Sequence, residues 1–93
     1  MTAKILIADD ERAITEGLSA ILRDEGYECE IASDGQRALE RLMAEPFGVV
    51  LADLKMPKVD GIALLREIRQ HEMATECIVI SGQGTIRSAV DAV

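Results

Sequence analysis

Cysteine, proline and aromatic residues are scarce in this sequence of 93 residues, which has 2 cysteines, 2 prolines, 1 tyrosine, 1 phenylalanine and 0 tryptophans. Cys29 and Cys77 have neither the spacing of a metal site nor a C-x-x-C pattern, and both lie in apolar stretches. We therefore expect two reduced, buried thiols rather than a structural disulfide. The first apolar run, residues 5–8, is too short for a signal-peptide core or a membrane span, which favours a cytoplasmic protein that does not enter a membrane.

Basic side chains are in the minority, with 10 Lys and Arg against 17 Asp and Glu and a formal net charge of −7. An acidic chain repels the phosphate backbone of nucleic acids and the surface of an anionic membrane. We therefore expect no direct binding of nucleic acid by this domain, whereas a metal ion or a basic partner would suit it. Hydrophobic residues make up 48% of the chain, which predicts a single globular domain over residues 1–93.

Short apolar segments alternate along the chain with segments of helical periodicity. Strands are predicted over residues 4–8, 27–32, 49–52 and 77–80. Helices are predicted over residues 11–25, 35–45 and 62–68, the first ended by Gly26 and the second by Pro46. This order predicts an α/β fold in which helices cover both faces of a doubly wound parallel sheet.

The last part of the chain predicts a fourth helix. Its apolar residues recur at the i, i+3, i+4 and i+7 spacing of one helix face and are Ile86, Ala89, Val90 and Val93. The pattern is still running at Val93, where no glycine, proline or basic last turn marks a helix end, so we expect the sequence to stop inside this helix.

Acidic residues stand at the carboxyl ends of two apolar strands. Asp9 and Asp10 follow the first strand, and Asp53 follows the third. If these strands are neighbours, the three carboxylates meet at one edge of the sheet, with Ser81 arriving from the fourth strand. Clustered carboxylates repel one another unless a cation lies among them, and oxygen-only ligands favour Mg²⁺, with Mn²⁺ able to substitute.

Each of these residues also has a simpler interpretation. Asp9 and Asp10 are suited to cap the first helix, Asp53 to end a strand in a turn, and Ser81 to cap the next helix. It is their combination that favours chemistry: a carboxylate can accept a phosphoryl group, a cation would neutralise the transferring oxygens, and the Ser81 hydroxyl would bond to them. Lys55 and Lys58 are more simply solvated charges on the loop, although the Lys55 carbonyl could bind the metal.

The motifs together resemble the receiver domain of two-component response regulators. The resemblance rests on residues 5–11 (Ile-Leu-Ile-Ala-Asp-Asp-Glu), on Asp53-Leu-Lys-Met-Pro57 followed by Asp60-Gly61, and on residues 78–82 (Ile-Val-Ile-Ser-Gly). It implies a flavodoxin-like fold with strand order 2-1-3-4. The loop at residues 81–85 with Ala89-Val90 is most similar to receivers that precede sigma-54-dependent activator ATPases.

The resemblance also implies the roles of the site residues. Asp53 would be the phosphoacceptor, with Ser81 contacting the phosphoryl group. Asp9, Asp10, Asp53 and the Lys55 carbonyl would hold Mg²⁺, and a histidine kinase would be the partner. The domain would then be a self-phosphorylating phosphoacceptor rather than a turnover enzyme, and it would control an output domain outside these residues.

One departure from the family pattern concerns the carboxyl-terminal part. A full receiver continues with a fifth strand, which carries a phosphate-binding lysine, and a fifth helix, so the sequence reads as truncated within the domain. Without that strand, residues 77–80 would form an exposed apolar edge. We therefore expect a homodimer, formed by pairing or by exchange of elements at this edge.

Two other functions remain as alternatives. The domain could be an interaction or dimerisation module that cannot be phosphorylated because it lacks the lysine. It could also be a haloacid-dehalogenase-like phosphatase, but those enzymes carry an acid two residues after the nucleophile, where this chain has Lys55.

Overall fold

The structure is a computed structural model, and it describes residues 4–56, 58–80 and, for the backbone, 86–88. Its elements in chain order are β1 (Lys4–Ala8), α1 (Arg12–Asp24), β2 (Glu28–Ala32), α2 (Gly35–Ala44), β3 (Val49–Asp53), α3 (Gly61–Gln70), β4 (Glu76–Ile80) and β5 (Ile86–Ser88). The predicted strands and helices up to Ile80 are confirmed, with small differences at their ends.

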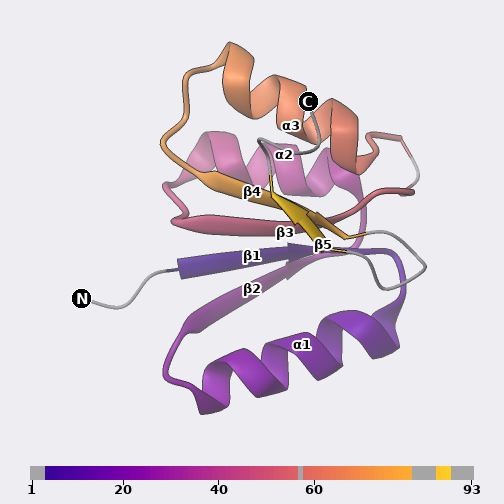
Figure 1. Cartoon of the computed structure of the whole chain (residues 1–93), viewed down its shortest axis with the longest axis vertical. Helices are drawn as coiled ribbons and strands as arrows, with labels where there is room; N and C mark the ends of the chain where they lie inside the picture. Colours follow the sequence, from indigo (N-terminus) through magenta and orange to yellow (C-terminus); the bar gives the residue numbers. More distant parts are fainter. Residues whose placement is uncertain (1–3, 57, 81–85, 89–93) are drawn as a thin grey trace.

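The strands form one sheet in the order β2-β1-β3-β4-β5. The pairs β1–β2, β1–β3 and β3–β4 are parallel, as the predicted order 2-1-3-4 requires. Helix α1 lies on one face of the sheet, and α2 and α3 lie on the other (Figure 1). In this arrangement Ala8 pairs with both Ala32 and Ala52, so the carboxyl ends of β1, β2 and β3 reach the same edge of the sheet.

The prediction of a helix from Ile86 is wrong for residues 86–88. These residues form β5, which runs antiparallel to β4 and pairs Ile80 with Ile86 and Ile78 with Ser88. The spacing of apolar residues carries only local information. The backbone N–H and C=O groups along the edge of β4 need hydrogen-bond partners, and residues 86–88 supply them. Residues 89–93 of the predicted helix lie outside the described part of the chain.

The same pairing corrects the predicted open edge of β4. Strand β5 covers this edge from Ile78 to Ile80, and within the described residues its pairing does not reach Glu76 or Cys77. A dimer formed along a fully exposed β4 edge is therefore no longer required by the fold.

The core fills the space between the sheet and the helices α2 and α3. Every second residue of the central strands faces it, and the buried core members from β1, β3 and β4 are Leu6, Ala8, Val50, Ala52, Cys77 and Val79. Leu42, Leu64, Leu65 and Ile68 from the two helices pack against them. Burying one such aliphatic side chain contributes about 1.5–3 kcal/mol. Cys77 is buried as predicted, but Cys29 is only half-buried, and both are free thiols.

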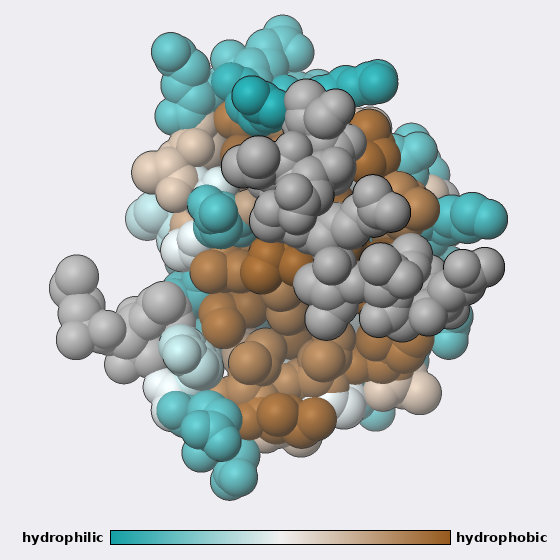
Figure 2. All heavy atoms as spheres, in the orientation of Figure 1, coloured by the Kyte–Doolittle hydropathy of each residue, from teal (hydrophilic) through white to brown (hydrophobic). Residues whose placement is uncertain are grey.

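Helix α1 does not bury the isoleucines that recur at helical spacing along it. Thr15 and Ser19 are its buried residues, whereas Ile14 and Ile21 are 41% and 64% exposed. Periodicity identifies an apolar stripe but not which flank of that stripe turns towards the sheet. Figure 2 shows that apolar atoms gather across the middle of the viewed face and that hydrophilic ones lie mostly around its margin.

Gly26 ends α1 as predicted, with a φ of +96° that favours glycine. In the part of the chain that the structure describes, no helix combines the length and the apolar content needed to cross a bilayer.

Candidate functional site

Three carboxylates converge where β1 and β3 end. Asp9 and Asp10 follow β1, and Asp53 is the last residue of β3. The side chains of these residues place one carboxylate oxygen each within 4.8 Å of the others. The parallel register Ala8↔Ala52 produces this proximity, because it puts the residues that follow on adjacent strands side by side.

Asp9 is the most buried of the three, with 7% of its surface exposed. Its Oδ1 accepts a hydrogen bond of 2.9 Å from the backbone N–H of Glu11. Burial raises the pKa of Asp9, the Glu11 N–H opposes this effect, and the charges of Asp53 and Asp10 add to the rise. Asp9 does not cap α1, since Glu11 is the N-cap residue and makes no side-chain cap hydrogen bond.

Asp53 is half-buried and stands at the end of its strand. Burial is the main reason that its pKa is raised, and the charge of Asp10 adds to the rise. The backbone N–H of Lys55 acts in the opposite direction by stabilising the carboxylate. Among the described residues, neither Asp9 nor Asp53 forms an ion pair with a basic side chain.

This donor set fits a divalent cation. Hard carboxylate oxygens are the ligands that Mg²⁺ prefers, and a cation among them would offset both the repulsion and the lost hydration. Within the described residues, Asp9, Asp10 and Asp53 are the group of acids close enough to share a metal ion.

The loop after Asp53 is anchored at several points. The N–H of Leu54 donates to the Ile80 carbonyl at 2.8 Å, and Met56 is buried in the core, whereas Lys55 is exposed. Asp60 caps α3 by accepting from the N–H of Ala63 at 2.8 Å. The predicted phosphoryl contact Ser81 lies outside the described residues.

Gly61 has a role that the sequence pattern did not reveal. A Cβ at this position would lie 2.5 Å from the Asp53 carbonyl oxygen and 3.2 Å from the Leu54 Cα. The first distance is far below van der Waals contact and is to a backbone atom, so α3 can begin this close to Asp53 only with glycine. The dipeptide Asp60-Gly61 predicted a turn, but only the packing of α3 against β3 exposes the steric demand.

A hollow of about 230 Å³ adjoins two of the acids. Its walls come from the β1–α1 connection, from α1 and from the end of β2, and its lining residues are Asp9, Asp10, Arg12, Thr15, Ile31 and Ser33. None of the last four residues was predicted as part of a site. They are scattered polar and apolar residues without a motif, so only the fold brings them together.

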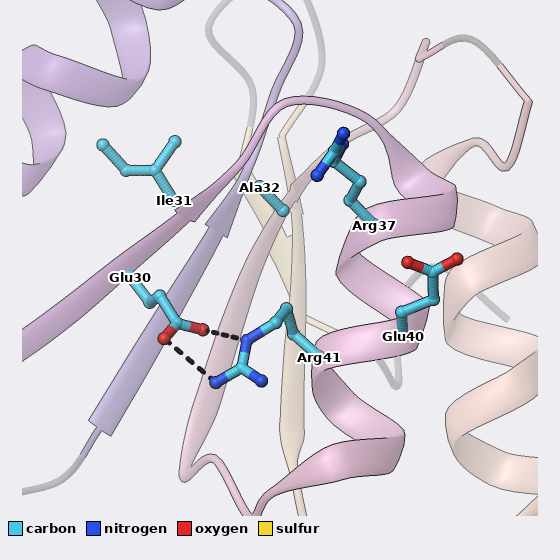
Figure 3. Close-up of a pocket in the computed structure, with 6 residues that line it drawn as sticks. All are labelled: Glu30, Ile31, Ala32, Arg37, Glu40 and Arg41. Atoms are coloured by element: carbon cyan, nitrogen blue, oxygen red, sulfur yellow. Dashed lines mark hydrogen bonds and ion pairs between the residues drawn. The ribbon is translucent and has the colours of Figure 1, made fainter.

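A second hollow, of about 180 Å³, lies between β2 and α2 and is drawn in Figure 3. Arg41 closes one side of it by donating from Nε and Nη2 to the Glu30 carboxylate at 2.7 and 3.0 Å. Ile31 points away from this ion pair, towards the opposite face of the sheet (Figure 3). The charged groups here already satisfy one another, so the acid cluster remains the candidate site.

Comparison with known proteins gives one consistent result. A family model described as the response regulator receiver domain matches residues 5–93. The Response regulator RR06 of Streptococcus pneumoniae serotype 2 is 40% identical over 87 residues, which cover 92% of this chain and 40% of that protein. The Transcriptional regulatory protein ZraR of Escherichia coli K12 is 35% identical over 88 residues, which cover 95% of this chain and 20% of that protein.

Solved structures agree with these relatives. The receiver domain of the Francisella response regulator 1452 superposes with a TM-score of 0.84 at 30% identity and is covered over 69% of its length by 90% of this chain. The response regulator protein TrrA of Thermotoga maritima, solved in complex with Mg²⁺ and BeF, has a TM-score of 0.81 at 33% identity, over 87% of this chain and 70% of that one. The chain thus spans about two thirds of these solved structures and between 20% and 40% of the two curated relatives.

Proposed function

The chain belongs to the response regulator receiver domain family, and from this membership we propose that it is a phosphoacceptor signalling domain in which Asp53 takes a phosphoryl group from a histidine kinase. The observation that carries the proposal is the placement of Asp53 with Asp9 and Asp10, whose carboxylate oxygens lie within 4.8 Å of one another. The half-buried Asp53 keeps part of its side chain open to a donor, while the neighbouring acids provide the place for a cation.

The proposed reaction is a single displacement at phosphorus. A carboxylate oxygen of Asp53 forms the new P–O bond, the P–N bond of the donor phosphohistidine breaks, and its electron pair goes to the imidazole nitrogen. When bound, Mg²⁺ would neutralise charge on the transferring oxygens. We assign its binding to Asp9, Asp10, Asp53 and the carbonyl of Lys55, with Mn²⁺ as a substitute, and we assign the phosphoryl contact to Ser81. That TrrA was solved in complex with Mg²⁺ and BeF supports the proposal that this chain binds Mg²⁺.

We propose a signalling role rather than turnover of a substrate. A phosphatase that uses an aspartyl phosphate needs an acid to protonate the leaving group, and the exposed Lys55 occupies the position where such enzymes carry it. Hydrolysis of a phosphomonoester by the chain would contradict this part of the proposal.

The rest of the signalling system follows as further parts of the proposal. An output domain outside these residues would respond to phosphorylation in the cytoplasm, and the transcriptional regulators among the relatives favour control of transcription. We also keep the resemblance to receivers of sigma-54-dependent activators and the homodimer as proposals. Light scattering across micromolar concentrations tests the dimer, and a monomer throughout would contradict it.

The direct test uses acetyl phosphate as the donor. With Mg²⁺ present, intact-mass measurement should find one added phosphoryl group on the wild-type chain and none on Asp53→Asn. Chelation of the metal should also prevent the addition. Asp24→Asn is the matched control, because Asp24 is an exposed acid at the end of α1, and it should be phosphorylated as the wild type is. Absence of the adduct from the wild type would favour a pure interaction module.

A further inference from the structure

The N-terminus of α2 presses against the loop that follows Asp53. Gly35, the first residue of α2, is buried, and a Cβ at this position would lie 2.5 Å from the carbonyl carbon of Val59 and 2.8 Å from its Cβ. Backbone therefore meets backbone at this point, and no larger residue fits unless the loop moves. Gly35 does not need a glycine-specific φ, since its φ is not in the positive region, so its requirement is steric.

An ion pair joins the same two segments. Oδ2 of Asp34 lies 3.7 Å from Nζ of Lys58, while its Oδ1 accepts from the N–H of Arg37 at 2.8 Å and caps α2. Lys58 adopts a φ of +70°, a conformation that costs free energy in a residue other than glycine and must be held by its surroundings. The pair is partly exposed, with 66% of the Lys58 side chain and 15% of the Asp34 side chain accessible, so it assists the steric contact rather than replacing it.

The loop that follows Asp53 is also held in place where it meets α3, next to Asp53. Gly61 packs on the backbone of Asp53, and its N–H donates to the Leu54 carbonyl at 3.3 Å. Val59 lies two residues before Gly61, so the contact with α2 and the contact with Asp53 act on one short segment. Because Gly61 is held against the backbone of Asp53, a shift of Val59 has to be absorbed within the loop between Asp53 and Gly61, which includes Lys55.

We propose that the N-terminus of α2 sets the shape of the β3–α3 loop, of which the structure describes residues 54–56 and 58–60, and so aims the Lys55 carbonyl and the Asp53 carboxylate at the cation. Gly35, Asp34 and Lys58 are positioning residues in this account, since they act through the loop and touch neither the metal nor the phosphoryl group. The inference rests on the proposed function for what the loop is aimed at.

Gly35→Ala is the main test. The added methyl displaces Val59, and we expect the dissociation constant for Mg²⁺ to rise about tenfold, as when groups that orient metal ligands are lost. In metal-free protein labelled with ¹⁵N, the amide resonance of Lys55 should shift as well as those near Gly35. Gly17→Ala is the matched control, because a Cβ at Gly17 in α1 meets nothing within 4 Å, and it should change neither readout.

A second pair of variants covers the case in which Gly35→Ala does not fold. Asp34→Asn keeps the helix cap but removes the charge, and Lys58→Met removes the partner charge. If Asp34 and Lys58 act on the cation only through the electric field of their charges, the effects of the two substitutions on Mg²⁺ affinity add. If the two residues hold the loop together as an ion pair, the effects do not add. We expect the double variant to depart from additivity in Mg²⁺ affinity by about two- to fivefold, the range of a partly exposed ion pair.

The outcomes separate this inference from the proposed function. If folded Gly35→Ala binds Mg²⁺ as tightly as the wild type and leaves the Lys55 amide unmoved, the inference is overturned. If that variant is unfolded, additivity of Asp34→Asn and Lys58→Met overturns it. If the wild type binds no Mg²⁺, the proposed function fails, and the shift of the Lys55 amide in the metal-free protein still decides whether α2 holds the loop.

Discussion

At the scale of single residues, the negative charges of the acid cluster lower the free energy of unfolding. Asp9 and Asp53 both have a raised pKa, caused first by burial and then by neighbouring carboxylates. Such residues make the folded protein less stable at neutral pH than neutral side chains of the same size would. Sites that bind cations commonly accept this cost, because the ligand offsets it when it binds.

Asp53→Asn should therefore stabilise the metal-free chain. The substitution removes a carboxylate that lies within 4.8 Å of two others, and the repulsion of two unit charges about 4 Å apart in water is about 1 kcal/mol. Urea unfolding in a chelating buffer measures the effect on the free energy of unfolding. Asp24→Asn serves as the control and should change stability little, and a less stable Asp53→Asn would contradict the prediction.

A pH prediction concerns Glu30, which lies on β2 away from the site. The hydrogen bond from Arg41 is the main reason that the pKa of Glu30 lies below its ordinary value of 4.5, and Lys4 adds to the effect. The stabilisation from this ion pair is present above that ordinary value and is lost as the pH falls through the lowered pKa. Thermal unfolding between pH 7 and 3 should show the loss in the wild type, and Glu30→Gln should lack this part of the pH dependence.

At the scale of elements, two glycines in helices have opposite requirements. Gly17 lies inside α1 and a Cβ there meets nothing within 4 Å, whereas Gly61 begins α3 against the backbone of Asp53. By intrinsic helix propensity, glycine weakens a helix at either position. Packing alone distinguishes the dispensable glycine from the required one.

Gly17→Ala should raise the free energy of unfolding by about 0.5–1 kcal/mol, because alanine loses less backbone entropy in a helix. Gly61→Ala should lower it by about 1–3 kcal/mol, the usual cost of forcing an extra methyl group into a packed region. Chemical denaturation of the two variants in parallel measures both values. Equal effects of the two substitutions would contradict the packing of α3 on β3.

At the scale of the whole molecule, the acid cluster joins loops that are distant in the sequence. Asp9 and Asp10 follow β1, Asp53 ends β3, and the sheet places them together. A ligand that binds this cluster therefore holds the sheet edge as a unit, and its binding energy adds to the stability of the folded chain.

Mg²⁺ should accordingly raise the melting temperature. A free concentration 100 times the dissociation constant adds about 2.7 kcal/mol to the free energy of unfolding. Differential scanning calorimetry with and without the ion measures the shift, which a chelator should reverse. In Asp53→Asn the shift should be much smaller, and an equal shift in both proteins would place the cation elsewhere.

Local sequence patterns determined the elements up to Ile80, the parallel α/β class and the residues at the carboxyl ends of the strands, whereas the strand order 2-1-3-4 was implied by the resemblance to receiver domains. Apolar runs, helical periodicity and punctuation by Gly and Pro are local signals, and the chirality of the crossovers leaves few topologies to choose from. With strands 1 and 3 as neighbours, which that resemblance implies, Asp9, Asp10 and Asp53 could be placed at one edge before any distance was known.

Tertiary structure decided what local signals do not carry. Residues 86–88 follow a helical pattern but pair with β4, since an open strand edge competes for their backbone groups. The flank of α1 that faces the sheet, the seat of Gly61 on Asp53 and the contact of Gly35 with Val59 depend on how whole elements approach one another. Sequence spacing determines which residues share a face of an element. Only the close packing of the elements determines at which positions no side chain larger than that of glycine fits.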